Sequence, residues 1–579
     1  MVVIAGSTSQ AWPISNKYQD NLKHWPSQPL PDALPRDIRP LPHVSFIEPF
    51  CIVAMLLNAR SEREETQNPP HHVLATSAGT SWTSYLPAIN PSPPQSRTQR
   101  DGGFSFFRSN SKRQKVAGQA EQRTGFRNPW KSWHKPTQKE VWSNLQWGED
   151  EDPAIDLAAS SSAPSRSSST RSRKSVLRRS GSEQSVKESR SAQAARLLRV
   201  VPPDFTFGAN RAKVTWLGHA SMLVQLPSLS PGGRPFCCLF DPIFSERASP
   251  VQNAGPVRFY PPPCKVEDLP AIDIMFLSHN HYDHLDYDTV MALWKNNGDT
   301  IRFVVPLDNK QWFVECGIPD ERVHELDWWD TLYLSTEKGL EQTVKITCTP
   351  SQHQSGRSGL DTDMALWSSW YVEHPKPEPY RVFFAGDTGF QFHASPNWPP
   401  SPPKPQTAKS GFKLPTKRSS RSGDPDEPGL EKFPACPAFQ DIVDRLGSPD
   451  LLLLPIWVGG TYDFLRSWVP LPDSVSPFPR HTMGVTAANH MPPWDAVRVL
   501  RLMTEKKEGT PSRTHAPVAV AMHWGTFITE PVEVLKTLGQ LQWACEQQDV
   551  RFARSPGGED GGTGETTFFA LDHGQSIVI

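Results

Sequence analysis

A ten-residue segment of this chain is rich in side chains that bind metals. The segment LSHNHYDHLD, from Leu277 to Asp286, follows the apolar run AIDIMF. Imidazole combined with carboxylate suits zinc or a similar divalent ion, whereas calcium and magnesium prefer shells of oxygen atoms. A solvated polar loop is the alternative, but four such residues directly after a strand favour a metal site. The four residues are His279, His281, Asp283 and His284.

The flanking residues predict where this segment lies. IDIMFLS predicts a buried strand that ends at Ser278, and DYDTVMALWK predicts a helix after the segment. Sites in α/β folds lie at the carboxyl ends of strands, so the side chains should converge at that edge. His279 and His281 can face one point while Asp283 and His284 face a second point, which predicts two metal ions.

Two metal ions need further ligands, and three candidates follow other apolar strands. They are His353 in ITCTPSQHQSGR, Asp387 in VFFAGDTGF and His523 in VAVAMHWGTF. A single histidine after a strand is more often an ordinary core or loop residue. The four-ligand motif favours a ligand role for these residues, because two ions require partners from elsewhere in the chain.

Ordered strings from about residue 201 to the C-terminus resemble a family of hydrolases. They include VTWLGHASMLVQ, DPIFSERASP, ELDWWD, TPSQHQS, FFAGDTGF, MHWGTF and FFALDHGQS. The HxHxDH core resembles the metallo-β-lactamase superfamily, and the surrounding strings resemble its N-acylphosphatidylethanolamine-hydrolysing phospholipase D family. The resemblance implies an α/β fold, the metallo-β-lactamase αββα sandwich, with a dinuclear metal site between two sheets.

The resemblance also implies a role for each ligand. The first ion would bind His279, His281 and His353, and the second would bind Asp283, His284 and His523. Asp387 would bridge them. The expected cofactors are two Zn²⁺ or similar divalent ions.

Three further residues are candidates for roles beside the ions. The resemblance places a functional histidine at His490, which suggests substrate binding or proton transfer; a surface histidine at a helix N-terminus remains the alternative. We take Asp283 and His490 as the candidate catalytic residues. His219 in WLGHAS and Asp241 in FDPIF lie at strand ends near the site and are expected just behind the ligands, His219 with a structural role and Asp241 orienting a ligand histidine.

The resemblance implies hydrolysis of N-acylphosphatidylethanolamine to N-acylethanolamine and phosphatidate. Two cations lower the pKa of a shared water toward about 7, so a metal-bridging hydroxide can attack the phosphodiester. A lactonase or thioesterase of the same superfamily, acting on a soluble substrate, is the alternative. A nuclease is disfavoured because the basic residues lie mostly in linkers, and a metal-free scaffold has no need of all seven ligands.

Composition divides the chain into four parts. Residues 1–125 are polar and rich in proline and should be disordered, and the tryptophan-rich segment 126–153 is expected to dock on the folded body. Residues 154–199 read as a Ser/Arg-rich linker. Residues 200–579 form the catalytic domain, with a disordered insertion at about 391–434.

Charge and cysteine content limit the partners and the compartment. The 60 basic and 61 acidic residues give a net charge of -1, so no overall field attracts nucleic acid. Eight scattered cysteines without a CxxC pair favour a reducing compartment. With no membrane-spanning run, we expect an intracellular protein, cytoplasmic or peripheral on a cytosolic membrane face, that meets a phospholipid substrate; the oligomeric state stays open.

Deleting Asn397 to Gly429 should leave the melting temperature and the metal content almost unchanged. This part of the expected insertion lies between two strings that adjoin in the family, so it should add little to the core. Calorimetry and elemental analysis of the deletion variant check this. Loss of soluble protein would show that the insertion packs on the fold.

Overall fold

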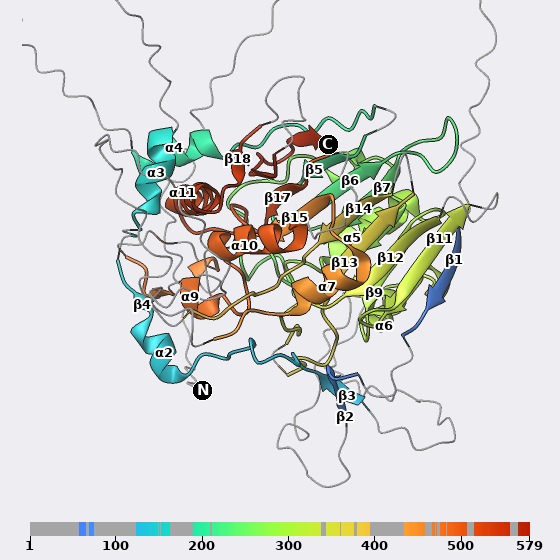
Figure 1. Cartoon of the computed structure of the whole chain (residues 1–579), viewed down its shortest axis with the longest axis horizontal. Coiled ribbons are helices and arrows are strands. Elements are labelled where there is room, and N and C mark those ends of the chain that lie inside the picture. The colour runs from blue at the N-terminus through green and yellow to red at the C-terminus, as the bar shows by residue number, and fades with distance from the viewer. Residues whose placement is uncertain are drawn as a thin grey trace, which may run out of the picture. The chain divides into compact units, whose positions relative to one another are not determined.

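The structure is a computed structural model of the chain (Figure 1). All described residues belong to one compact unit, Ala54–Ile579. The structure describes residues 57–64, 69–74, 123–148, 150, 152–161, 189–208, 211–336, 343–358, 360–375, 379–393, 433–457, 466–468, 471, 475–481, 483–505, 515–555 and 565–579.

One sheet has seven strands, in the order β10-β9-β8-β7-β6-β5-β20. Strands β7 to β10 run parallel, so their carboxyl ends share one edge. Every residue of β6 and β7 is buried, as expected for strands covered on both faces. The strands are β5 (Lys213–Trp216), β6 (Met222–Leu226), β7 (Phe236–Phe240), β8 (Ile274–Phe276), β9 (Arg302–Pro306), β10 (Val323–Leu326) and β20 (Ser576–Val578).

The second sheet has nine strands, in the order β1-β11-β12-β13-β14-β15-β17-β19-β18. Strands β14, β15 and β17 run parallel, and β12 shares their direction because both β12 and β14 pair antiparallel with β13. The strands are β1 (Leu57–Glu62), β11 (Thr331–Thr336), β12 (Thr343–Thr349), β13 (Ser369–His374), β14 (Tyr380–Phe384), β15 (Leu451–Pro455), β17 (Val518–Met522), β18 (Arg551–Ala553) and β19 (Thr567–Phe569).

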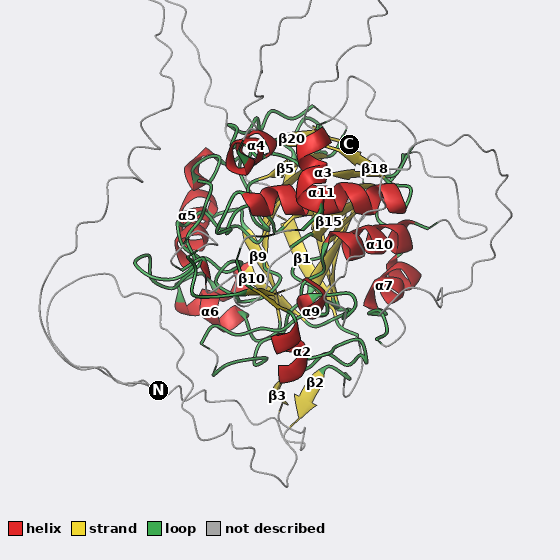
Figure 2. Ribbon diagram, turned by 90° about the vertical axis from the view of Figure 1, so that its left-hand side faces the viewer, coloured by secondary structure: helices red, strands yellow, loops and turns green. Residues whose placement is uncertain are grey.

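The two sheets pack face to face with helices outside them. The ring of Phe240 stacks on Phe276 of its own sheet and on Phe384 of the other sheet, with centroids 4.5 and 4.7 Å apart. Helices α5 (Tyr287–Asn297) and α6 (Lys310–Glu315) lie on one side of the sheets, and α7 (Ala438–Leu446) and α10 (Pro493–Thr504) lie on the other (Figure 2). This arrangement confirms the predicted αββα sandwich.

Segments before residue 126, expected to lack structure, contribute strands. β1 pairs antiparallel with β11, from Leu57 opposite Thr336 to Glu62 opposite Thr331. β2 (His72–Leu74) pairs with β3 (Arg123–Phe126). The expectation of disorder for 1–125 is therefore wrong at these strands, because pairing satisfies backbone groups that composition does not reveal. The rest of that range lies outside the described residues.

The tryptophan-rich segment 126–153 packs on the folded body. The rings of Trp130 and Trp328 stack with centroids 5.4 Å apart. Helix α2 (Gln138–Ser143) begins with a capping box between Thr137 and Glu140, which satisfies its first backbone donors. The segment continues into β4 (Leu145–Gln146), which pairs with β16 (Arg480–His481) before α9 (Met483–Thr486).

The Ser/Arg-rich range 154–199 is helical at both of its ends, unlike the predicted linker. Helices α3 (Ala154–Ser161) and α4 (Arg190–Leu197) pack on α11 (Val532–Gln547). Small apolar residues such as Ala158 and Ala194 are buried there, which the polar composition hides. Residues 162–188 lie outside the described residues.

The predicted insertion at 391–434 begins and ends inside the fold. Phe392 and His393 are buried, and His393 Nε2 lies 2.9 Å from Asp495 Oδ2 of α10. Phe433 packs beside Phe392, with ring centroids 4.6 Å apart. The boundary therefore needs correction, because these aromatic rings complete a small core; residues 394–432 lie outside the described residues.

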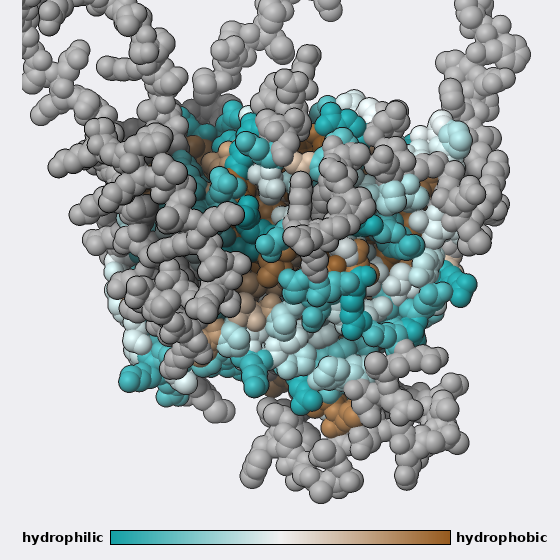
Figure 3. All heavy atoms as spheres, viewed as in Figure 1, coloured by the Kyte–Doolittle hydropathy of each residue, from teal (hydrophilic) through white to brown (hydrophobic). Residues whose placement is uncertain are grey.

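The visible surface mixes polar and apolar side chains, and the described helices are short or polar. On the face shown in Figure 3, hydrophobic side chains appear among hydrophilic ones. Within the described residues, no helix is both long enough and apolar enough to cross a membrane. The described residues also include two short 3₁₀ helices, at Val266–Asp268 and Asp320–Arg322.

Replacing Gly539 of α11 by alanine should destabilise the protein. A Cβ atom there would overlap the carbonyl oxygen of Ala154, at the start of α3. Elsewhere in a helix the change adds up to about 1 kcal/mol of stability, but overpacking here should lower the free energy of unfolding by about 1 to 3 kcal/mol. Urea denaturation measures this. Gly208→Ala, where a Cβ meets nothing within 4 Å, is the control. Equal stability of the Gly539→Ala variant and the wild type would contradict the packing of α3.

Candidate metal centre

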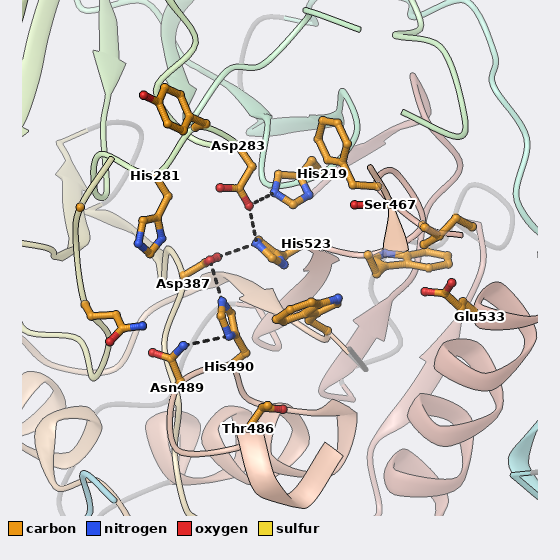
Figure 4. A pocket seen from close by; sticks show the side chains of 18 of the residues that line it. His219, His281, Asp283, Asp387, Ser467, Thr486, Asn489, His490, His523 and Glu533 are labelled. Carbon is orange, nitrogen blue, oxygen red and sulfur yellow. Dashed lines mark hydrogen bonds and ion pairs between the residues drawn. The ribbon is translucent and has the colours of Figure 1, made fainter. Parts of the chain in front are cut away.

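The predicted ligands lie where the carboxyl ends of strands from both sheets meet. Residues 279–284 follow β8 of the seven-stranded sheet. His353, Asp387 and His523 follow β12, β14 and β17 of the nine-stranded sheet. Figure 4 shows Asp283, Asp387 and His523 pointing toward one another across the cavity between these strand ends. The structure therefore brings together all seven residues that the sequence predicts as ligands.

Three histidines form the first cluster. Nε2 of His279 lies 2.8 Å from Nδ1 of His281, and Nε2 of His353 lies 3.4 Å from the same Nδ1 atom. All three ligand atoms lie within 4.8 Å of one another. This is the set that the family resemblance assigns to the first ion.

The second cluster combines a carboxylate with histidines. Oδ2 of Asp283 lies 3.6 Å from Nε2 of His284 and 3.7 Å from Nε2 of His523. His219 joins them, since its Nε2 lies 3.1 Å from the same carboxylate oxygen. The sequence placed His219 at a strand end beside the predicted ligands, with a structural role, but did not identify Asp283 as its partner.

Asp387 lies between the two clusters and is almost fully buried. Its Oδ1 is 3.0 Å from Nε2 of His523, and its Oδ2 is 3.2 Å from Nε2 of His284. On the side of the first cluster, the same Oδ2 lies 3.7 Å from Nε2 of His353 and 3.9 Å from Nε2 of His279. One carboxylate thus faces both clusters, as a bridging ligand must.

Burial and pairing set the protonation of these groups. Burial lowers the pKa of His281 to about 4, so this ring is neutral and keeps a lone pair for a cation. Burial favours the protonated form of Asp387, but His284 and His523 outweigh it and hold the pKa of Asp387 well below its usual value. Burial also acts on His523, yet the Asp387 carboxylate raises the pKa of that ring to about 9. The site therefore keeps a buried carboxylate ionised.

Unsatisfied buried atoms show that this group of residues fits divalent cations. Nε2 of His284, Nε2 of His523 and Oδ1 of Asp387 are buried without a hydrogen-bond partner. These atoms form ion pairs at 3.0 and 3.2 Å but have no aligned hydrogen bond. All three face the space between the clusters, where imidazole and carboxylate are suitable ligands for an ion of the zinc class.

Hydrogen bonds behind the histidines turn their Nε2 atoms toward this space. Nδ1 of His284 lies 2.7 Å from Oδ2 of Asp241, a contact through which Asp241 can orient this ring as expected. Oγ of Ser278 donates to the same carboxylate and lies 2.9 Å from Nδ1 of His279. Nδ1 of His353 donates to the carbonyl oxygen of Asn489 at 3.0 Å. Each contact places a proton on Nδ1 and leaves Nε2 free for a cation.

His219 supports the second cluster from its other side. Burial lowers the pKa of His219 to about 3, so the neutral ring can donate its Nε2 proton to Asp283. The His219 carbonyl oxygen accepts a hydrogen bond of 2.8 Å from the backbone N–H of His523. His219, Asp241 and His523 have φ values of 48°, 39° and 59°, a strained backbone region for residues other than glycine.

His490 lies in the site and is not a surface histidine. Its Nε2 is 3.1 Å from Oδ2 of Asp387, and its ring centroid lies 4.9 Å from that of His353. It belongs to the turn between α9 and α10, and its ring also meets the edge of Trp457 at 4.4 Å. In this position His490 can contact a substrate or transfer a proton, the two roles suggested for it.

A cavity of about 540 Å³ opens over the clusters. Apolar side chains line much of it, and the sequence did not identify which ones. In the sequence, these lining residues could have been recognised only as aromatic residues close to the ligand motifs, such as Tyr282 within HxHxDH and Trp524 after His523. Arg357 also lines it, with its guanidinium 3.9 Å from the ring centre of Tyr282. The apolar lining residues are Tyr282, Trp457, Trp524, Phe527 and Ile528.

Comparison with known proteins places this fold in a superfamily. Residues 238–396 match the model of the β-lactamase superfamily domain. An uncharacterised protein of Mycobacterium tuberculosis is 35% identical over 368 residues, which cover 64% of this chain and 73% of that protein.

Two named phospholipases match over shorter stretches. The N-acyl-phosphatidylethanolamine-hydrolyzing phospholipase D 1 of Caenorhabditis elegans is 40% identical over 179 residues, 30% of this chain and 46% of that protein. The mitochondrial N-acyl-phosphatidylethanolamine-hydrolyzing phospholipase D of Saccharomyces cerevisiae is 35% identical over 176 residues, 30% of this chain and 34% of that protein. These matches cover less than half of each phospholipase.

Replacing His219 by asparagine should weaken the second cluster selectively. The variant loses the contact with Asp283, and removing such a support typically lowers metal affinity about 10- to 100-fold. Elemental analysis after dialysis at limiting free zinc should find one ion fewer than in the wild type. His374→Asn, which changes a buried histidine of β13 outside the site, is the control. Unchanged metal content in the His219 variant would show that this residue contributes to packing and not to metal binding.

Proposed function

Because this chain belongs to the metallo-β-lactamase superfamily, in one family with the mycobacterial protein, we propose that it hydrolyses N-acylphosphatidylethanolamine to N-acylethanolamine and phosphatidate. The superfamily and the His/Asp clusters indicate a metal-dependent hydrolase. The phospholipid substrate is supported by the two phospholipases, each matched over part of its length.

The observation that carries the proposal is the Asp387 carboxylate between two clusters of imidazole nitrogens. Two divalent ions bound there would supply a hydroxide at neutral pH and positive charge for the oxygens of a phosphodiester. The first ion would be held by His279, His281 and His353, and the second by Asp283, His284 and His523.

The chain's own residues orient the reacting groups. Asp283 is held by His219, which fixes the direction of its carboxylate. The ring of His490 lines the cavity while Asp387 holds its Nε2 atom, so His490 can contact a substrate oxygen or transfer a proton to the leaving alkoxide. These positions support Asp283 and His490 as the catalytic candidates.

The cavity supports a substrate that is apolar on one side of its phosphate. Trp457, Trp524 and Phe527 form walls close to the clusters. A volume of about 540 Å³ falls in the range of sites that enclose most of a small ligand. A phospholipid can place its phosphate at the clusters and an acyl chain along these walls.

Exposed apolar side chains beside the cavity support contact with a membrane surface. Ser467 lines the cavity, and Trp468 next to it is 45% exposed. Phe259 is 40% exposed, and its backbone N–H donates to the carbonyl oxygen of Thr526, next to the cavity residue Phe527. Apolar rings at this rim would enter the bilayer interface while the substrate is drawn toward the clusters.

Incubating the purified full chain with N-acylphosphatidylethanolamine in detergent should release N-acylethanolamine and phosphatidate in equal amounts. A chelator should abolish the reaction, and Asp387→Asn should lower turnover at least about 100-fold, because the carboxylate shared by both clusters is lost. Mass spectrometry of both products measures this.

The control is Asp288→Asn, which removes an exposed carboxylate of α5 and should keep full turnover. Chelator-sensitive hydrolysis of a lactone or thioester, without any release of N-acylethanolamine, would replace the phospholipase with the soluble-substrate alternative.

A further inference from the structure

A second group of metal-binding side chains lies outside the candidate metal centre. His71 and His72 are consecutive, and both rings reach Asp327, which follows β10. Nε2 of His71 lies 2.7 Å from Oδ1 of Asp327, and Nε2 of His72 lies 2.8 Å from Oδ2. The three ligand atoms lie within 4.8 Å of one another, so a single ion can contact all of them.

This group is largely buried and incompletely satisfied. The side chains of His71, His72 and Asp327 are 4%, 12% and 17% exposed. Nε2 of His72 is buried without a hydrogen-bond partner, although the carboxylate is close, because the two are not aligned for a hydrogen bond. A cation between the rings and the carboxylate would satisfy this nitrogen.

Aromatic rings surround the group. His71 stacks on Trp328 with centroids 4.2 Å apart, and His72 meets the edge of Phe126 at 5.4 Å. Such apolar surroundings exclude water and strengthen the attraction between a cation and a carboxylate. They also fix the rings in place before an ion arrives.

The ligand set suits an ion of the zinc class. Two imidazoles and one carboxylate, with water as the fourth ligand, form a common environment for zinc. Calcium and magnesium prefer oxygen ligands and fit poorly.

We propose that His71, His72 and Asp327 bind a third divalent ion of the zinc class, with a structural role. The ion ties residues 69–74 to the loop after β10. The backbone N–H of Arg127 donates to the carbonyl oxygen of His71 at 2.8 Å, and the Asn128 side chain donates to the carbonyl oxygen of His353 at 2.7 Å. The segment held by this ion therefore braces the backbone of a predicted ligand of the candidate metal centre.

The metal content of the full chain tests this proposal. After dialysis in zinc-buffered solution, elemental analysis should find three zinc ions per wild-type chain and two per chain of the His72→Ala variant. Excess chelator should lower the melting temperature of the wild type more than that of the variant. The control is His324→Ala, which removes another histidine with a buried, unpartnered Nε2 and should keep three ions.

Two further variants separate the sites. Asp327→Asn keeps the side-chain size, removes the charge and should also bind two ions. This variant tests the site even if His72→Ala does not fold. Asp387→Asn should lose ions at the candidate metal centre and keep the one at Asp327. Two ions in the wild type and two in Asp327→Asn would overturn the third site. Three ions in a chain without phospholipase activity would count against the proposed function alone.

Discussion

The ionised carboxylate of Asp387, buried among histidines, is the constraint on which the rest of the site depends. A buried charge is stable only when it is paired from several sides. Here the partners come from both sheets and from the turn between α9 and α10. The strand ends must therefore stay aligned, because the separation of any element would leave this charge without compensation. The five histidines within 4 Å of its oxygens are His279, His284, His353, His490 and His523.

Alignment is maintained by contacts one layer behind the clusters. Asp241 holds His284 from the seven-stranded sheet, and the carbonyl oxygen of His219 accepts from the backbone of His523 in the nine-stranded sheet. The strained backbone at His219, Asp241 and His523 is stable because the surrounding hydrogen bonds over-determine it. The two sheets thus act as one support.

The same arrangement links the site to segments distant in sequence. Asn128 and Ser132 donate to residues 353 and 352 in the loop after β12, so the tryptophan-rich segment supports the first cluster. His71 and His72 anchor a still earlier segment at Asp327. Above the clusters, Trp457 and Trp524 supply the apolar wall that a lipid substrate would meet. Binding, support and access therefore involve different parts of one chain.

The sequence alone identified the seven ligand candidates, because short-range spacing and placement after strands are local properties that HxHxDH and the strings around it display directly, and the resemblance of these strings to a superfamily implied the sandwich. It missed β1, α3 and α4, since polar or small residues reveal no pairing until a neighbouring edge or helix is present. It placed His219 near the site without identifying its partner, and it left open whether His490 lies in the site or on the surface. Only the tertiary structure decided these, because a side chain's role in a buried site depends on which remote groups reach it, and that contact is fixed by packing rather than by local pattern.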